Sequence, residues 1–173
     1  VGDNARAATA AQQAASSLGY NALVLSTFLE GEAREVAKLL VALGREVRAH
    51  GRPVAVPACL ILGGETTVTL GRDPGRGGRN QEVALAAAVA LAGLDGITVG
   101  ALATDGTDGP TDSAGAIVDG GTLARADEEG LDAADHLARH DAYPLLGATG
   151  DLLRSGPTNT NVNDLLFVVV RPA

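Results

Sequence analysis

The sequence predicts an α/β layered domain in which a largely parallel sheet is flanked by helices. Short apolar runs alternate along the chain with longer segments whose apolar residues recur at helical spacing. Strands that are apolar throughout are typical of sheets covered on both faces, which are mostly parallel. The 173 residues, 46% of them hydrophobic, suit a single domain over 1–173 with one core. Because only 2% are aromatic, that core must consist of Ala, Val, Leu and Ile.

The first third of the chain predicts helices and strands in alternation. In order, these are a helix up to residue 18, a strand at 22–26, a helix that stops before Gly51 and a strand at 58–62. Asp3 and Asn4 are suitable N-caps for the first helix, and Gly19 suits its left-handed end. The second helix carries acidic residues in its first turn and basic residues in its last, as the helix dipole favours.

The remainder continues the pattern. It predicts a helix at 80–91, a strand at 97–104, two short acidic helices near 122–129 and 132–140, and a buried strand, LLFVVV, at 165–170. The helix at 80–91 is apolar on most sides and therefore predicted to lie between layers. In open α/β sheets ligands bind beyond the carboxyl ends of strands. We therefore expect the site near the loops that follow Leu62, Thr104 and Leu153.

Charge and composition disfavour several partners. Thirteen Lys and Arg against 21 Asp and Glu give a net charge of -8, which repels nucleic-acid backbones. The apolar stretches are too short to span a bilayer, and a lone cysteine, Cys59, cannot form a disulfide within the chain. We expect a cytoplasmic protein without nucleic-acid or membrane partners.

The stretch GRGGRNQE, residues 75–82, predicts an anion site. Its glycines let backbone amides approach a ligand, the following helix points its positive end into the loop, and the arginines can fork onto a carboxylate or phosphate. The alternative is a solvated turn whose arginines pair with neighbouring acids. Glu65, in GGET, is expected to tether an arginine of this loop. The substrate- or phosphate-binding candidates are Gly77, Gly78, Arg76 and Asn80, beside Arg79.

Two further loops carry polar groups. Asp105, Asp108 and Asp112 gather in one loop after a strand, where carboxylates can hold Mg²⁺ or accept a proton from a substrate hydroxyl. A chain of Asx turns is the alternative reading. Thr158 and Asn161 belong to the stretch SGPTNTNVND, whose side chains can bind a polar ligand or brace neighbouring loops.

Several sharper motifs are missing from the sequence. The one lysine, Lys38, has no Walker A glycines around it, GRGGRN is not a dinucleotide fingerprint, and no serine lies in GxSxG. His136 and His140 are four residues apart and could share a metal, but no third ligand is evident, so a solvated helix face is the preferred interpretation.

Four motifs in order, GGETTVTL, GRGGRNQE, TDGTDGPTDSAGA and GPTNTNVNDL, closely resemble the C-terminal MOFRL domain of the glycerate 2-kinase family, which older descriptions call hydroxypyruvate reductase. Residues 58–173 resemble the MOFRL core, and 1–57 resemble the adjoining segment. The resemblance implies an N-terminal kinase domain that is absent here and that normally supplies a catalytic lysine and most of the nucleotide site. Asn159 departs from the pattern, since the family more often has glycine there.

The resemblance also implies a reaction. The family transfers the γ-phosphoryl group of ATP to a hydroxyl of D-glycerate, usually giving 2-phosphoglycerate, with Mg²⁺ implied. Carried over by motif, Arg79 would contact the substrate carboxylate or the transferred phosphate. Asp105 and Asp108 would serve metal, proton or positioning roles, with Glu65, Asp112, Thr158 and Asn161 supporting them. This chain alone is expected to be inactive.

Two other functions compete with this one. A non-catalytic module that binds a small carboxylate or phosphate metabolite would need the same anion loop. An NAD(P)H-dependent hydroxypyruvate reductase would need a dinucleotide fingerprint that the sequence lacks.

Overall fold

The computed structural model describes residues 3–172, which form six helices and six strands. The helices are α1 (Asn4–Ser17), α2 (Ala33–His50), α3 (Arg79–Leu91), α4 (Thr122–Glu128), α5 (Ala133–Ala138) and α6 (Ala142–Ala148). The strands are β1 (Asn21–Glu32), β2 (Ala58–Thr67), β3 (Ile97–Ala103), β4 (Gly115–Asp119), β5 (Leu152–Leu153) and β6 (Asp164–Val170). The expected N-cap is present, because the Asp3 carboxylate accepts the Arg6 amide at 2.8 Å.

The strands form one mixed sheet in the order β1-β2-β6-β3-β4-β5. The α/β class with flanking helices is confirmed, but the expectation of a largely parallel sheet is corrected. Among the described strands, only β1 and β2 pair in parallel, whereas β6 runs antiparallel to both β2 and β3, and β4 runs antiparallel to β3 and β5. The last strand inserts between two strands that sequence order would have placed side by side.

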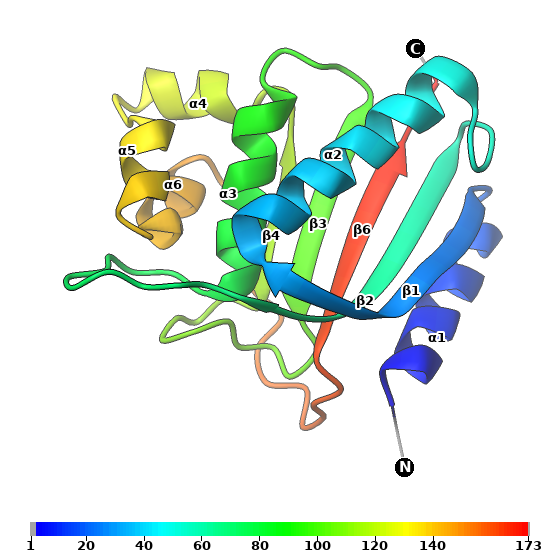
Figure 1. Cartoon of the computed structure of the whole chain (residues 1–173), viewed down its shortest axis with the longest axis horizontal. Helices are drawn as coiled ribbons and strands as arrows, with labels where there is room; N and C mark the ends of the chain where they lie inside the picture. Colours follow the sequence, from blue (N-terminus) through cyan, green and yellow to red (C-terminus); the bar gives the residue numbers. More distant parts are fainter. Residues whose placement is uncertain (1–2, 173) are drawn as a thin grey trace.

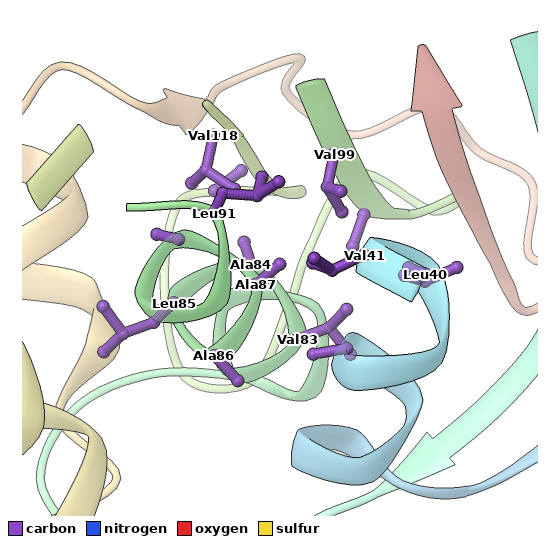
Figure 2. Close-up of a cluster of buried hydrophobic side chains, with 14 of the residues drawn as sticks. Leu40, Val41, Val83, Ala84, Leu85, Ala86, Ala87, Leu91, Val99 and Val118 are labelled. Atoms are coloured by element: carbon purple, nitrogen blue, oxygen red, sulfur yellow. The ribbon is translucent and has the colours of Figure 1, made fainter. Parts of the chain in front are cut away.

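Helices α2 and α3 cover one face of the sheet (Figure 1). Helix α3 is buried on nearly every side, as its apolar composition predicts, because α2, α5, α6 and the sheet surround it. Figure 2 shows Val83, Ala84 and Ala87 of α3 among side chains of α2 and the sheet. The small alanines allow the close helix–sheet approach that a core poor in aromatic residues requires.

Helix α1 covers part of the opposite face. Along β2, Leu60 and Leu62 belong to the main core, whereas Cys59 and Ile61 pack with Ala8 of α1 in a second cluster. Successive side chains of a strand point to opposite faces, so an unbroken apolar strand requires cover on both. Among residues 3–172, no helix has the length and apolar content that crossing a bilayer requires.

Three chain segments meet at one edge of the sheet. Strand β2 continues five residues past Leu62, so GGET lies within the strand and not in the expected loop. Because β6 runs antiparallel to β2 and β3, its first residue, Asp164, pairs with Gly64 of β2 and Ala103 of β3. The loops after Ala103 and before Asp164 therefore leave the sheet at the edge where β2 ends.

Candidate functional site

A cavity of about 970 Å³ opens at this edge of the sheet. The ends of β1 and β2 form one wall, with Phe28 and Val68 among its apolar residues. The glycine loop (residues 75–78) and the start of α3 form a second wall, and residues 107–110 of the acidic loop (residues 105–112) form a third. Of the predicted site residues, Glu65, Gly77, Gly78, Arg79 and Asp108 line it.

Arg79 is held by acids from two strands. Its Nη1 donates to Glu65 Oε1 on β2, the contact expected for Glu65, and its Nη2 lies 3.5 Å from Asp164 Oδ2 on β6. Burial opposes the charged guanidinium, but Asp164, Glu65 and Asp108 outweigh it and raise the pKa of Arg79. The side chain remains 39% exposed, so a ligand in the cavity can reach it.

The glycine loop presents free donors beside this arginine. Within residues 3–172, the backbone amides of Gly77, Gly78 and Arg79 donate to no acceptor, and all three residues line the cavity. A Cβ on Gly78 would lie 2.3 Å from Asp108 Cγ, and one on Gly109 would lie 2.4 Å from Gly77 O. Only glycine permits the glycine loop and the acidic loop to touch so closely.

Asp108 is buried, with 3% of its surface exposed, and it caps α3. Its Oδ1 accepts from the Asn80 amide nitrogen at 3.1 Å, and its Oδ2 accepts from the Gln81 amide nitrogen at 2.9 Å. Burial raises the pKa of Asp108 in spite of these hydrogen bonds. The positive end of α3, which we expected to hold a ligand, therefore already holds a carboxylate of the protein itself.

Asp164 belongs to this site and was missing from the predicted set. It is 1% exposed, and burial raises its pKa to about 6, although the Asn80 side chain and Arg79 both lower it. Asn80 thus bridges Asp108 and Asp164 and is not on the cavity wall. The signal in the sequence was an acidic residue at the start of an otherwise apolar strand, NDLLFVVV. A carboxylate in a loop is expected to be exposed, but Asp164 is buried in the sheet.

Replacing Asp164 by asparagine should change how stability depends on pH. The folded pKa of about 6 exceeds the ordinary 3.8, so the folded chain binds this proton more tightly than the unfolded chain. Asp164 therefore contributes stability at pH below about 4 that is lost as the pH rises through about 6. Denaturant unfolding at a series of pH values should show Asp164→Asn gaining stability relative to the natural chain across this window. Parallel curves would contradict the raised pKa.

The remaining predicted residues brace loops outside the cavity wall. Asp105 Oδ2 accepts from the Asn161 side chain at 3.2 Å, and the Asp105 carbonyl accepts from the Thr158 amide at 3.1 Å. The structure therefore places Asp105 against the loop before β6 and outside the set of residues that line the cavity. Bracing, the alternative reading of Thr158 and Asn161, is the role their contacts show.

Arg76 also points away from the cavity. Its guanidinium lies 4.1 Å from the centre of the Tyr143 ring, and the Tyr143 hydroxyl donates to Asp112 Oδ1 at 2.6 Å. Arg154 pairs with the same carboxylate at 3.2 Å. This exposed cluster joins the glycine loop to the acidic loop, which is a supporting role for Arg76 and Asp112.

A second group at the cavity was not predicted. Glu82 of α3 and His140 both line the cavity, and the Arg34 side chain of α2 contacts both of them. We expected His140 to lie on a solvated helix face with His136. Instead, His136 is 8% exposed and its Nδ1 hydrogen-bonds the Asp141 carbonyl, whereas His140 lines the cavity.

The donor set does not make a metal cage. Within residues 3–172, no three or more His, Cys, Asp or Glu side chains are arranged to hold a metal ion. Both oxygens of Asp108 already accept backbone amides. The two predicted metal candidates, Asp105 and Asp108, thus do not form a Mg²⁺ site by themselves.

Comparison with known proteins places these features in context. The sequence profile of the MOFRL family matches residues 58–164. The chain is 44% identical to a D-glycerate 2-kinase of Thermotoga maritima over 98% of the chain and 40% of that protein, and 42% identical to a glycerate 2-kinase of Pyrococcus horikoshii over 98% of the chain and 38% of that protein. A crystal structure of glycerate kinase from Thermotoga maritima superposes with a TM-score of 0.95 at 44% identity, over 98% of this chain and 41% of that one. The chain thus spans about two fifths of the length of these relatives.

Proposed function

Because the chain belongs to the MOFRL family, we propose that it is the C-terminal portion of a kinase that transfers the γ-phosphoryl group of ATP to a hydroxyl of D-glycerate, giving 2-phosphoglycerate. The names of the relatives from Thermotoga maritima and Pyrococcus horikoshii support the glycerate substrate. The four motifs that carry the resemblance surround the cavity or brace its loops.

The observation that carries this proposal is the donor group at the cavity. Arg79 and the glycines 77 and 78, whose backbone amides are free, line a space large enough for a small anionic metabolite. D-glycerate carries a carboxylate, and the transferred group carries phosphoryl oxygens. Backbone amides and a fork-shaped guanidinium are the usual partners of both groups.

Phosphoryl transfer makes limited chemical demands on this portion of the protein. A hydroxyl oxygen of D-glycerate bonds to the γ-phosphorus, the bond from that phosphorus to the departing ADP oxygen breaks, and the hydroxyl proton is released. Positioning and neutralisation of the phosphoryl charge dominate catalysis. Arg79 would supply charge, and the glycine-loop amides would fix the oxygen to which they donate. Because Glu65 and Asp164 hold Arg79 beforehand, little reorganisation is needed when the ligand binds.

The rest of the catalytic machinery belongs, in this proposal, to an N-terminal kinase domain. The described residues offer no lysine at the cavity and no metal cage, whereas phosphoryl transfer normally uses both. That domain would hold most of the nucleotide together with Mg²⁺. Carboxylates of this chain could at most add a ligand to a metal held mainly by phosphate oxygens.

A coupled assay of ADP formation with D-glycerate tests the proposal. The complete natural polypeptide should turn over, and residues 1–173 alone should not. Enolase supplied without a phosphoglycerate mutase would identify 2-phosphoglycerate as the product. Full activity of the 173-residue chain would refute the division of labour, and D-glycerate binding by the complete polypeptide without ADP formation would instead support the non-catalytic binding module.

A further inference from the structure

We propose that His140 is an anion-binding residue of the cavity, donating from Nε2 to a carboxylate or phosphate oxygen of the ligand that Arg79 also contacts. The identity of this ligand as D-glycerate or ATP rests on the proposed function. The binding role rests on the position of the imidazole and on the charges around it.

His140 has a left-handed backbone conformation in the turn between two helices. It lies between α5 and α6 with φ 54°, a left-handed conformation that is uncommon outside glycine, asparagine and aspartate. The same turn supports the glycine loop, because the Arg139 carbonyl accepts the Gly75 amide at 2.8 Å and the Tyr143 amide donates to the Arg76 carbonyl at 2.9 Å. His140 is thus attached to the loop that presents the free amides.

Two side chains fix the imidazole through one nitrogen. Nδ1 lies 3.0 Å from Glu82 Oε1 and 2.9 Å from Arg34 Nη2. Arg34 is itself anchored by its Nε, 2.5 Å from Glu82 Oε1, and by Nη2 donation to the Leu137 carbonyl. The His140 side chain is 14% exposed, and in the described part of the chain no residue hydrogen-bonds Nε2. Nε2 is therefore the nitrogen left for a ligand.

The cavity wall has few charged side chains that can donate to an anionic ligand. Of the described residues that line it, only Arg79 and His140 can carry positive charge, whereas Glu30, Glu65, Glu82 and Asp108 can be negative. Arg79 is already shared between Glu65 and Asp164. A doubly or triply charged ligand would meet net repulsion from these walls unless another donor contributes.

The groups around His140 permit it to be that donor. Glu82 of α3 and Arg34 of α2 pair with each other beside the ring. On its own turn, Arg139 and Asp141 likewise pair, at 3.2 Å. Because the Arg34 guanidinium can only donate to Nδ1, the ring carries its proton on Nε2, and this Nε2–H can make a charge-assisted hydrogen bond to an anion in the cavity.

Replacing His140 by asparagine distinguishes a role in ligand binding from a structural role. Asparagine tolerates a left-handed backbone and places an amide near Nδ1, so His140→Asn should keep the contact with Glu82 and fold normally while losing Nε2. In the complete natural polypeptide we expect KM for D-glycerate or for ATP to rise about tenfold, the loss of one charged hydrogen bond, with kcat less affected. A rise for D-glycerate assigns the contact to the carboxylate, and a rise for ATP assigns it to phosphate. His50→Asn, at the exposed end of α2, is the matched control.

The reciprocal variant excludes a merely structural role. His140→Gln keeps a donor near Nε2 but loses the Nδ1 contact, so its KM should lie closer to the natural value than that of His140→Asn. A structural role predicts the opposite order. An unchanged KM for both ligands in His140→Asn would overturn the proposal.

Histidine NMR keeps this test independent of the kinase activity. The signal that disappears in His140→Asn should shift saturably when D-glycerate, ATP or inorganic phosphate is added to the complete polypeptide. A polypeptide that shows this shift but forms no ADP would refute the proposed reaction and retain the anion site. No shift with any of the three compounds would refute the role of His140.

Discussion

Replacing Arg79 by alanine should lower kcat/KM for D-glycerate by about 100-fold or more in the complete natural polypeptide, as removal of a charge-stabilising donor typically does. The guanidinium is the one arginine on the cavity wall in the described part of the chain, and Glu65 and Asp164 fix it from two strands. Steady-state kinetics with D-glycerate and ATP varied separately would measure the loss.

Two comparisons sharpen this prediction. Arg79→Lys keeps the charge without the planar fork and should recover only part of the activity. Arg52→Ala removes an exposed arginine that pairs with Glu46, away from the cavity, and should leave the kinetics unchanged. If Arg79→Ala has the same kinetics as the natural protein, Arg79 does not bind the ligand, and the glycine-loop amides are the main anion donors.

Replacing Asp108 by alanine should lower the free energy of unfolding by about 3 kcal/mol, because it leaves buried amides of Asn80 and Gln81 without their acceptor. Denaturant unfolding monitored by circular dichroism would measure the change. Asp112→Ala, which removes an exposed carboxylate from the same loop, should cost far less stability. Equal losses in the two variants would show that the cap does not support α3.

Asparagine at position 108 distinguishes support from catalysis. Asp108→Asn keeps one oxygen that can accept an α3 amide, so it should be more stable than Asp108→Ala. If Asp108 also acts on the substrate, as the family resemblance implies, this variant should lose activity out of proportion to its stability. If Asp108 only caps α3, activity should follow stability across both variants.

The elements of the fold were predicted more completely from the sequence than the order of the strands in the sheet. Apolar periodicity predicted α2 and α3 and the buried strands β2, β3 and β6, since each pattern arises within one element. It did not predict that β6 would lie between β2 and β3, because strand direction depends on partners distant in sequence. Strand β4, Gly115–Asp119, was not among the predicted elements, because its apolar run at 116–118 is short and directly follows a glycine-rich turn.

The candidate site, like the fold, was predicted only in part from the sequence. Local chemistry identified the glycine loop, Arg79 and Glu65, because glycines and arginines ahead of a helix are informative without knowledge of their neighbours. It assigned Arg76 to the same anion site, yet Tyr143, 67 positions later, draws that side chain away. Asp164 and His140 were not in the predicted set, because neither an acid at the start of an apolar strand nor a histidine near a short helix identifies the partners that the fold brings to it.

By itself, the sequence determined the longer helices and the buried strands, the α/β class and the family, since each depends on residues close together or on motifs in order. Tertiary structure alone decided that Asp164 would meet Arg79, that Asp108 would occupy the end of α3 and that Glu82 and Arg34 would hold His140. The physical reason is that these partners are distant in sequence, 85 positions for Arg79 and Asp164 and 106 for Arg34 and His140, and only the packing at the sheet edge brings them together.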